Sequence, residues 1–517
     1  MCSSDLRCVQ IAAFAVALEA WKYPGAGGYH PLPRLNIACS GLPVGDSFEE
    51  WMEFAAVAAD KHLPADRKLF SDTPLETIWH TEVINGMKVL YDLFKQAPLL
   101  GSLIDPSKFT GNLQAEGYSQ LSKLLDRALS RVDRSNGFRT REIAAAAQGM
   151  AAAAKLLVGR YHLVATNVPY LARGKQSDEL KQYCADHHGE GKNDLATAFL
   201  LRCLDLCVQR GTVSAVLPQN WLFLGTYKKL REKLLKEESW RLIARLGPQA
   251  FQTPMWDFNV QLFTLTKGTS PEFTLSSTAG PTGVLRGLDA SEPREPVVKA
   301  ELLRTATLKS VDQASQLKNP DARVILDILP TSETTMGDFV DVPQGMKTGD
   351  DHRYRFVFWE TNMPSVWKLY QSTPESNVVQ FYSGLSNIIR WENNGESLAR
   401  LQGEAAWGKQ GLALSQMASM PWSLYTGSIY DSNINVVVPL MPRYHTEVVT
   451  YAISSGFQRV VRVLDQKVSV TNATLKKVPF DLARWTKVAQ EKYPNGLPKP
   501  YTNDPTQWIF HGHPCGN

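Results

Sequence analysis

Short apolar runs and amphipathic stretches alternate along the middle of the chain. Residues 161–166 are rich in β-branched and aromatic side chains, which is typical of a buried strand, and the short apolar run 213–217 predicts the next buried strand. Between them, residues 194–208 place apolar side chains on one face of a helix, with Asp194 as the candidate N-cap. A basic amphipathic helix and two more strands continue the series at 226–236, 241–246 and 259–266. This alternation predicts an α/β domain with a Rossmann-like (doubly wound) sheet.

The residues before this series indicate mainly helices. Residues 8–21 are apolar around most of a helix, which predicts a buried helix. An alanine-rich stretch at 144–157 predicts a helix that packs closely against its neighbours. Residues 173–192, in contrast, are polar and contain glycine, so they predict a loop. Further helices are predicted at 48–59, 81–95 and 112–132.

The character of the sequence changes twice after residue 267. From 268 to 335 the apolar rhythm fails and Pro, Ser, Thr and Gly cluster at first, which predicts a linker or peripheral segment. From 336 to 517 short strands alternate with loops and aromatic residues. We therefore expect an incomplete α/β domain at 1–267 and an irregular α+β, β-rich domain at 336–517 that is truncated at its C-terminus.

Composition narrows the class of protein. The chain has 517 residues, 44% of them hydrophobic and 21% charged, as in ordinary globular proteins. Its net charge of +4 supplies no argument for nucleic-acid binding, so any such surface would be local. Seven scattered cysteines without a CxxC pair favour reduced thiols in a cytoplasmic protein. No apolar run reaches transmembrane length, and His187 and His188 lack a third ligand at zinc-like spacing, so we predict neither membrane association nor a metal site.

The turn after the first predicted strand carries the candidate chemistry. It reads Asn167-Val168-Pro169-Tyr170, at the end of a strand, where ligands bind in open α/β sheets. An amino group on a base is a poor nucleophile because its lone pair is conjugated into the ring. The Asn167 side-chain oxygen and the Val168 carbonyl are two acceptors suited to localising that pair, while Pro169 stiffens the turn. The Tyr170 ring is suited to stacking on the base, although an ordinary Asn-Pro turn is the alternative interpretation.

With these elements in order, the chain resembles the DNA methyltransferases that modify adenine N6. It looks most like the large branch found in type IIG restriction–modification enzymes and in BREX- or DISARM-type phage defence. Their signature turn is Asn-Pro-Pro-Tyr, from which Asn167–Tyr170 departs only at Val168. Residues 194–207 are similar to the helix after that turn, and residues 212–222 to the next strand and its Pro-x-Asn-x-Leu segment. The resemblance covers most of the chain from Arg7 onward.

The resemblance implies a site-specific enzyme that transfers methyl from S-adenosylmethionine to an adenine flipped out of duplex DNA. It implies that Asn167 and the Val168 carbonyl orient the amino group. Pro169 completes the catalytic turn, and Tyr170 stacks on the base. The partners implied are double-stranded DNA and subunits of a restriction or defence system.

Further DNA contacts are also implied by the resemblance. The segment 250–267 is similar to one whose aromatic residue packs against the flipped base, a role that falls to Phe251 with Trp256 and Phe258 as rivals. The opening of the second domain resembles the family's target-recognition region and supplies Lys347, Thr348, Arg353 and Arg390 as DNA-binding candidates. Independently of the resemblance, the polar stretch after the turn offers Arg173 and Lys175 as phosphate contacts, with a simply solvated loop as the alternative interpretation.

The sequence matches the cofactor-binding motifs of this family less closely than it matches the catalytic turn. The family binds S-adenosylmethionine through a glycine-rich turn after its first strand and an acidic residue that ends the second. That acid falls near Ser3, with Asp5 as a second acid nearby, and Ser40 stands in the adenine-contacting segment. We expect the chain to begin downstream of the true domain start, so cofactor binding by this chain is doubtful. A non-catalytic DNA-binding fragment and a protein glutamine methyltransferase remain the alternatives.

Overall fold

The computed structural model describes most of the chain, which divides into two compact units. Unit 1 comprises Met1–Pro218, Lys236–Gly283 and Asp289–Thr305, and unit 2 comprises Gln219–Leu235, Val284–Leu288 and Ala306–Asn517. The three-part division predicted at residues 267 and 335 stays a prediction. The described residues are 2–3, 6–25, 27–33, 35–41, 47–53, 75–109, 138–251, 259–268, 283–327, 332–361, 366–375, 381–417, 419–465 and 469–509.

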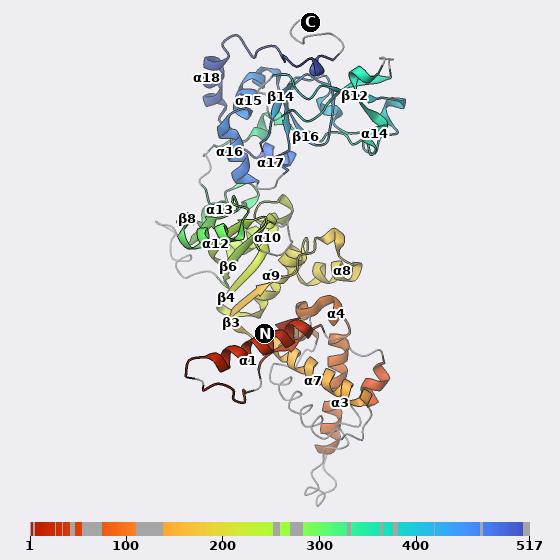
Figure 1. Cartoon of the computed structure of the whole chain (residues 1–517), viewed down its shortest axis with the longest axis vertical. Helices are drawn as coiled ribbons and strands as arrows, with labels where there is room; N and C mark the ends of the chain where they lie inside the picture. The colour runs from red at the N-terminus through yellow and green to blue at the C-terminus, as the bar shows by residue number, and fades with distance from the viewer. Residues whose placement is uncertain are drawn as a thin grey trace, which may run out of the picture. The chain divides into compact units, whose positions relative to one another are not determined.

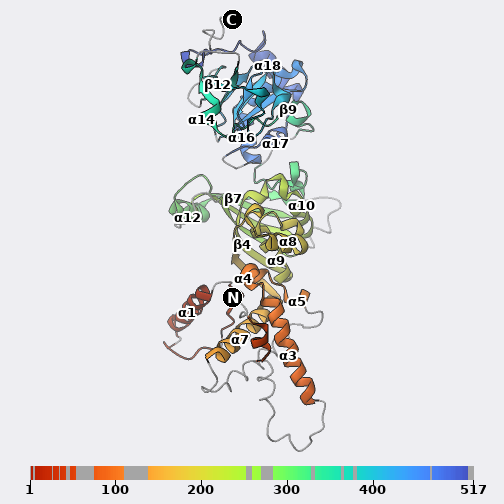
Figure 2. The same ribbon diagram turned by 90° about the vertical axis from the view of Figure 1, so that its right-hand side faces the viewer.

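A mixed sheet forms the centre of unit 1. The first four strands in its order are β3 (Tyr161–Asn167), β4 (Cys207–Pro218), β6 (Val260–Thr266) and β5 (Ser239–Gly247). β3 and β4 are parallel, whereas β6 is antiparallel to both β4 and β5. Figure 1 shows β4 beside β6, and Figure 2 shows β4 again after a turn of 90°. The α/β fold class and the four predicted strands are therefore confirmed, but the prediction that 161–166 form a buried strand is wrong, because no residue of β3 is buried. The reversed direction of β6 makes the sheet mixed.

Alternating side chains anchor this sheet. In β4, Val213, Ala215 and Leu217 are buried at every second position, as expected of a strand with one face against the core. Phe263 of β6 is fully buried and packs edge-on against Trp240 of β5, with ring centroids 5.0 Å apart. Contacts of this kind hold the two antiparallel strands in register.

Three helices belong to the same part of the chain. α9 (Leu195–Leu206) begins at its predicted N-cap, Asp194, whose side chain accepts a hydrogen bond from Ala196 N. α10 (Lys228–Glu237) is the predicted basic helix. The prediction of a polar loop at 173–192 is wrong, because this stretch contains the helix α8 (Asp178–His187). Its polar residues face solvent, and its apolar stripe is confined to Leu180, Tyr183 and Cys184.

A helical region precedes the sheet in unit 1. It contains α3 (Leu75–Phe94), α4 (Ala97–Leu100), α5 (Pro106–Phe109) and α7 (Phe138–Val158). Buried residues of α3 and α7, such as Phe94 and Ala151, share one core cluster, so the close packing predicted for the alanine-rich stretch is confirmed. The helix predicted at 112–132 lies outside the described residues, and the one predicted at 48–59 is described only to residue 53.

The first helix is less buried than its sequence suggests. α1 (Leu6–Lys22) has apolar residues around its circumference, yet Ile11 and Phe14 are 67% and 64% exposed. The prediction of a buried helix at 8–21 is therefore wrong for this chain. Beside α1, β1 (Cys2–Ser3) pairs in parallel with β2 (Ala38–Cys39).

Unit 2 is rich in short strands, as predicted. One four-stranded antiparallel sheet has the order β14 (Trp422–Tyr425), β13 (Gly411–Ser415), β16 (Ile434–Pro439), β9 (Val340–Asp341). A second has the order β10 (Arg355–Val357), β12 (Asn387–Arg390), β11 (Trp367–Gln371), β15 (Ile429–Tyr430).

Helices cover the first of these sheets. Buried residues such as Leu412 of β13 share a core cluster with Val448, Val461 and Leu475 from three different helices. The segment predicted as a linker also has regular structure. In chain order it contains β7 (Val284–Asp289), α12 (Pro296–Thr305) and β8 (Lys309–Asp312), and β7 and β8 pair in the antiparallel direction. The remaining helices of unit 2 are α13 (Gln313–Gln316), α14 (Asp351–Tyr354), α15 (His445–Ala452), α16 (Ser455–Leu464), α17 (Asn472–Lys476) and α18 (Leu482–Lys492).

Candidate functional site

The four residues of the predicted turn lie at the carboxyl end of β3. Asn167 ends the strand and pairs with Val216 of β4 in the parallel register. Val168 is only 4% exposed, so its side chain anchors the turn in the interior. Asn167 and Pro169 are exposed and Tyr170 is half-buried. The turn thus presents the Asn167 amide to the surface. Val168, the residue that differs from the family signature, is buried.

Asn167 and Tyr170 contact each other directly. The Tyr170 hydroxyl donates a hydrogen bond to Oδ1 of Asn167 over 3.3 Å. A carboxamide oxygen has two lone pairs, so Oδ1 retains one acceptor position for another N–H. The contact therefore orients the Asn167 amide without exhausting it.

Asp194 fixes the chain that leaves this turn. Its Oδ1 accepts hydrogen bonds from Ala196 N at 2.9 Å and from Leu171 N at 3.4 Å. Leu195 N also donates to the Leu171 carbonyl over 3.0 Å. Asp194 therefore caps α9 and holds the residue next to Tyr170. The capping role was predicted from its position before an apolar stripe, but no local pattern indicates a partner 23 residues away.

The same carboxylate affects the protonation of the turn. Burial raises the pKa of Asp194, although its hydrogen bonds from Ala196 and Leu171 favour the charged form. Burial and the charge of Asp194 together raise the pKa of Tyr170 to about 12. The Tyr170 phenol therefore stays protonated at neutral pH and can serve as the donor to Asn167.

A cavity of about 530 Å³ runs along β3 and reaches the turn. Its lining includes Leu163, Asn167, Val168, Phe199 and Arg202. β3 is the edge strand of its sheet among the described residues, and Leu163 on it is 62% exposed. The cavity volume lies within the range of small-molecule sites, roughly 300–1,000 Å³.

The Arg202 side chain in this lining is structural. It is 1% exposed and its Nη1 lies 3.3 Å from Oδ2 of Asp105. Its Nη2 donates to the carbonyls of Ile104 and Leu157, at 2.8 and 2.9 Å. Arg202 thus ties α9 to the helical region, a role that sequence does not indicate because its acidic partner lies almost 100 residues away.

The residues predicted to contact the cofactor are only partly described. Ser40 is fully buried, and its hydroxyl lies 2.9 Å from that of Ser102, which lines the cavity. Asp5 lies outside the described residues. The apolar wall formed by Leu157 and Phe199 suits the adenosine part of S-adenosylmethionine. The described lining residues include no carboxylate for the ribose hydroxyls, so the fit of the cofactor rests on cavity size and apolar character.

The base-stacking candidates and the DNA-contact candidates have different surroundings. Phe251 is 40% exposed, whereas its rivals Trp256 and Phe258 lie outside the described residues. Thr348 is buried and donates to Asp351, so its hydroxyl already has a partner. The other candidates include half-buried Arg173 and four residues with exposed side chains, Lys175, Lys347, Arg353 and Arg390.

The part of the chain that the structure describes has neither a metal-binding cluster nor a membrane-spanning helix. No group of three or more His, Cys, Asp or Glu side chains is arranged there to hold a metal ion. No helix in the same residues is long and apolar enough to cross a membrane.

Comparison with known proteins assigns the first half of the chain. Residues 5–251 match the family described as Eco57I restriction-modification methylase. This part of the chain, just under half of its length, is therefore similar to a restriction–modification methylase domain.

Two curated relatives match shorter stretches. The adenine-specific methyltransferase BrxX of Escherichia coli O9:H4 (strain HS) is 30% identical over 159 residues, which is 31% of this chain and 12% of the relative. The adenine-specific methyltransferase PglX of Lacticaseibacillus casei (strain Zhang) is 32% identical over 100 residues, or 19% of this chain and 8% of the relative. The matched stretches thus span about a tenth of the length of these relatives.

Solved structures of restriction–modification enzymes are similar to a larger part of the chain. One is a nuclease-deletion mutant of the type ISP enzyme LlaGI in complex with a DNA substrate mimic. The similarity covers 93% of this chain and 56% of the LlaGI chain. Its TM-score is 0.42 at 10% identity. Another is the type IIL enzyme MmeI in complex with DNA. The similarity covers 71% of this chain and 59% of the MmeI chain, with a TM-score of 0.39 at 10% identity.

Proposed function

We propose that the protein transfers a methyl group from S-adenosylmethionine to the N6 amino group of adenine in duplex DNA. We place it in a restriction–modification or phage-defence system. The observation that carries this proposal is the Asn167–Tyr170 turn, whose amide and phenol meet at the end of β3 in a domain similar to the Eco57I methylase family. Adenine-specific relatives support the choice of base.

The chemistry needs acceptors for the amino group. Asn167 Oδ1 accepts one N–H of the adenine amino group and the Val168 carbonyl accepts the other, which localises the nitrogen lone pair. A cofactor held against Leu157 and Phe199 would supply an electrophilic methyl group and keep the electron pair of its C–S bond, while the methylated amino nitrogen releases a proton to water. Positioning and polarisation therefore carry the catalysis, without a general base before attack.

The Tyr170 ring holds the target base. An adenine in a duplex must leave the base stack, at a cost of a few kcal/mol that contacts in the pocket offset. Stacking on Tyr170, with Phe251 as a second aromatic contact, supplies part of that compensation. The phenol at the same time keeps the Asn167 amide oriented toward the amino group.

Unit 2 is proposed to recognise the DNA. Its exposed cations Lys347, Arg353 and Arg390 suit contacts to phosphates, which position a protein on the duplex. Reading of base edges is assigned to the aromatic and amide side chains of the same unit.

The test is methyl transfer by the protein expressed from its natural gene. Tritium-labelled S-adenosylmethionine is incubated with adenine-containing duplex DNA or with glutamine-containing peptides, and Asn167→Ala is compared with the wild type. We expect label in DNA, at N6 of adenine, and a loss of at least about 100-fold in Asn167→Ala, typical of removing a group that stabilises the transition state.

A control variant separates chemistry from folding. Gln182→Ala removes an amide from the exposed side of α8, where Gln182 bonds only to Asp186 in the same helix. We expect it to retain full transfer. Equal activity in Asn167→Ala and the wild type, label in peptide instead of DNA, or DNA binding without any transfer would each contradict the proposed function.

A further inference from the structure

Arg231 of α10 is a buried cation that bonds to the backbone of two distant turns. Its side chain is fully buried. The guanidinium donates to the carbonyls of Trp221 and Leu224 on one side and to those of Asp321 and Ala322 on the other. Burial and the charge of Arg323 lower the pKa of Arg231 to about 10, so it remains charged at neutral pH. Losing this side chain would remove a hydrogen bond from each of these four carbonyls.

The second of these turns has an unusual backbone. Asp321 and Ala322 are consecutive non-glycine residues with positive φ, +57° and +52°. Non-glycine residues adopt this left-handed region at a cost, so surrounding contacts must hold the turn. Arg231 binds both carbonyls, and Val324 N donates to the Leu222 carbonyl over 3.1 Å. The turn at 321–322 and the turn at 221–224 are thus fixed to each other.

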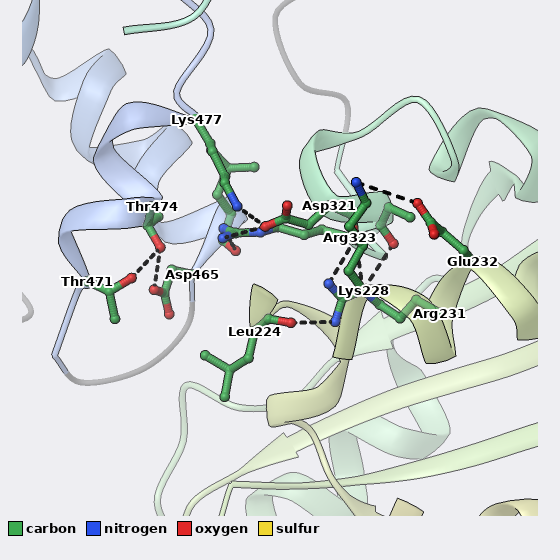
Figure 3. Close-up of polar contacts among 12 residues, drawn as sticks. Leu224, Lys228, Arg231, Glu232, Asp321, Arg323, Asp465, Thr471, Thr474 and Lys477 are labelled. Atoms are coloured by element: carbon green, nitrogen blue, oxygen red, sulfur yellow. Dashed lines mark hydrogen bonds and ion pairs between the residues drawn. The ribbon is translucent and has the colours of Figure 1, made fainter. Parts of the chain in front are cut away.

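The Asp321 carboxylate connects this pair of turns to the C-terminal part of unit 2. It pairs with Lys477, which follows α17, and its Oδ2 lies 3.7 Å from Nη2 of Arg323. Arg323 is 3% exposed and donates to the Leu464 carbonyl at the end of α16 over 2.9 Å. Figure 3 shows the side chains of Arg231, Asp321, Arg323 and Lys477 converging between these segments. Carboxylate, guanidinium and ammonium groups therefore meet at one partly buried point.

We propose that Arg231, Asp321 and Lys477 form a positioning clamp, through which the C-terminal part of unit 2 holds the segment that follows β4. Residues 219–235 belong to unit 2, although the chain enters them from β4 and leaves them toward β5. The clamp is what attaches them there, because it joins residues 221–224 and α10 to the ends of α16 and α17.

The clamp has a consequence for the candidate site. Asn167 pairs with Val216 of β4, and Gln219 follows Val216 by three residues along the chain. The clamped segment is therefore linked through the end of β4 to the strand that carries Asn167. This step rests on the proposed function, in which Asn167 orients the target amino group.

Hydrogen exchange of the full chain tests the clamp without relying on activity. Asp321→Asn removes the charge but keeps a residue that tolerates the left-handed region, so it separates the ion pairs from backbone strain. We expect amides in 219–227 and 321–324 to exchange about tenfold faster or more, while those of β4 and β6 keep the wild-type rate. Lys477→Met should produce the same local change, and Lys477→Arg should restore the wild-type rate.

A matched control comes from the same helix. Glu232 forms a partly exposed pair with Lys228, with 3.7 Å between the charged atoms, so Glu232→Gln removes a charge from α10 while the Arg231 hydrogen bonds and the Asp321 ion pairs stay in place. It should leave exchange in 219–227 unchanged. Wild-type exchange in Asp321→Asn, or an equal rise in β4, β6 and the clamped segments, would overturn the proposal.

Kinetics then test the link to the site. Loosening the clamp should lower kcat for methyl transfer at least about fivefold and alter KM for DNA less, because the bound base is less well positioned. Faster exchange in 219–227 with an unchanged kcat would refute the positioning role. A wild-type protein without transfer activity would refute the proposed function alone, because the exchange result decides the clamp by itself.

Discussion

The Tyr170 phenol and the Asn167 amide are joined by a hydrogen bond of 3.3 Å within one four-residue turn. The proposed catalytic acceptor is therefore oriented by the residue proposed to stack on the base. Because the pKa of Tyr170 is raised to about 12 by burial and by Asp194, this donor keeps its proton at any pH at which the protein is expected to work.

Two substitutions of Tyr170 distinguish its ring from its hydroxyl. Tyr170→Phe keeps the stacking surface and removes one hydrogen bond of ordinary strength, so kcat should fall only a fewfold. Tyr170→Leu also removes the aromatic face, so its kcat/KM should be about tenfold lower than that of Tyr170→Phe. Steady-state methylation of a target duplex measures both. Equal losses in the two variants would show that the ring does not contribute by stacking.

Asp194 is predicted to support activity beyond its helix cap. Asp194→Ala removes the cap of α9 and the bond to Leu171 N, next to Tyr170. We expect about 1 kcal/mol lower stability, as for loss of an N-cap, and a kcat reduced about tenfold because the turn is less well fixed. Denaturant unfolding and methylation rates measure the two effects.

Ser177→Ala is the matched control for Asp194→Ala. Ser177 caps α8 by accepting a hydrogen bond from Leu180 N, and its loss should cost a similar amount of stability. Transfer activity should stay near the wild-type rate. If both variants lose activity equally, the role of Asp194 reduces to helix capping.

Local patterns predicted the strands of the sheet and the position of the turn at the end of β3. Residues 213–217 are a short apolar run, and Asp194 precedes an apolar stripe, so each element needs only near neighbours to be recognised. The contacts of Arg202 with Asp105 and of Arg231 with residue 321 join distant positions, and no sequence spacing specifies them. For the same reason, apolar residues 8–21 predicted a buried helix, although burial depends on what packs against it.

The buried pair of Arg202 and Asp105 should dominate the stability of the helical region. Arg202→Met leaves the Asp105 carboxylate, 5% exposed, without its cation, and should cost about 3–5 kcal/mol. Replacing both residues by apolar ones of similar size should cost clearly less, because no buried charge remains. Urea unfolding of the two single variants and the double variant measures this coupling. Additive losses would mean that the two side chains do not stabilise each other.

The Asp321 ion pairs should make stability depend on pH in the acid range. Burial alone would raise the pKa of Asp321, but the hydrogen bond and charge of Lys477, with Arg323 and Arg231, hold it below its usual value. A lowered carboxyl pKa contributes stability that is fully present above the unfolded value, about 3.9, and is lost as pH falls through the folded value. Asp321→Asn should therefore cost about 1–3 kcal/mol at pH 7 and much less at pH 3.

Urea unfolding of the wild type and Asp321→Asn at the two pH values measures that difference. Glu232→Gln serves as the control because its partly exposed pair with Lys228 should contribute little at either pH. A cost for Asp321→Asn that is the same at pH 3 and pH 7 would mean that its charge does not hold the turn at 321–322. In that case the left-handed backbone there depends on the Arg231 hydrogen bonds alone, and Lys477→Met should leave the protein as stable as the wild type.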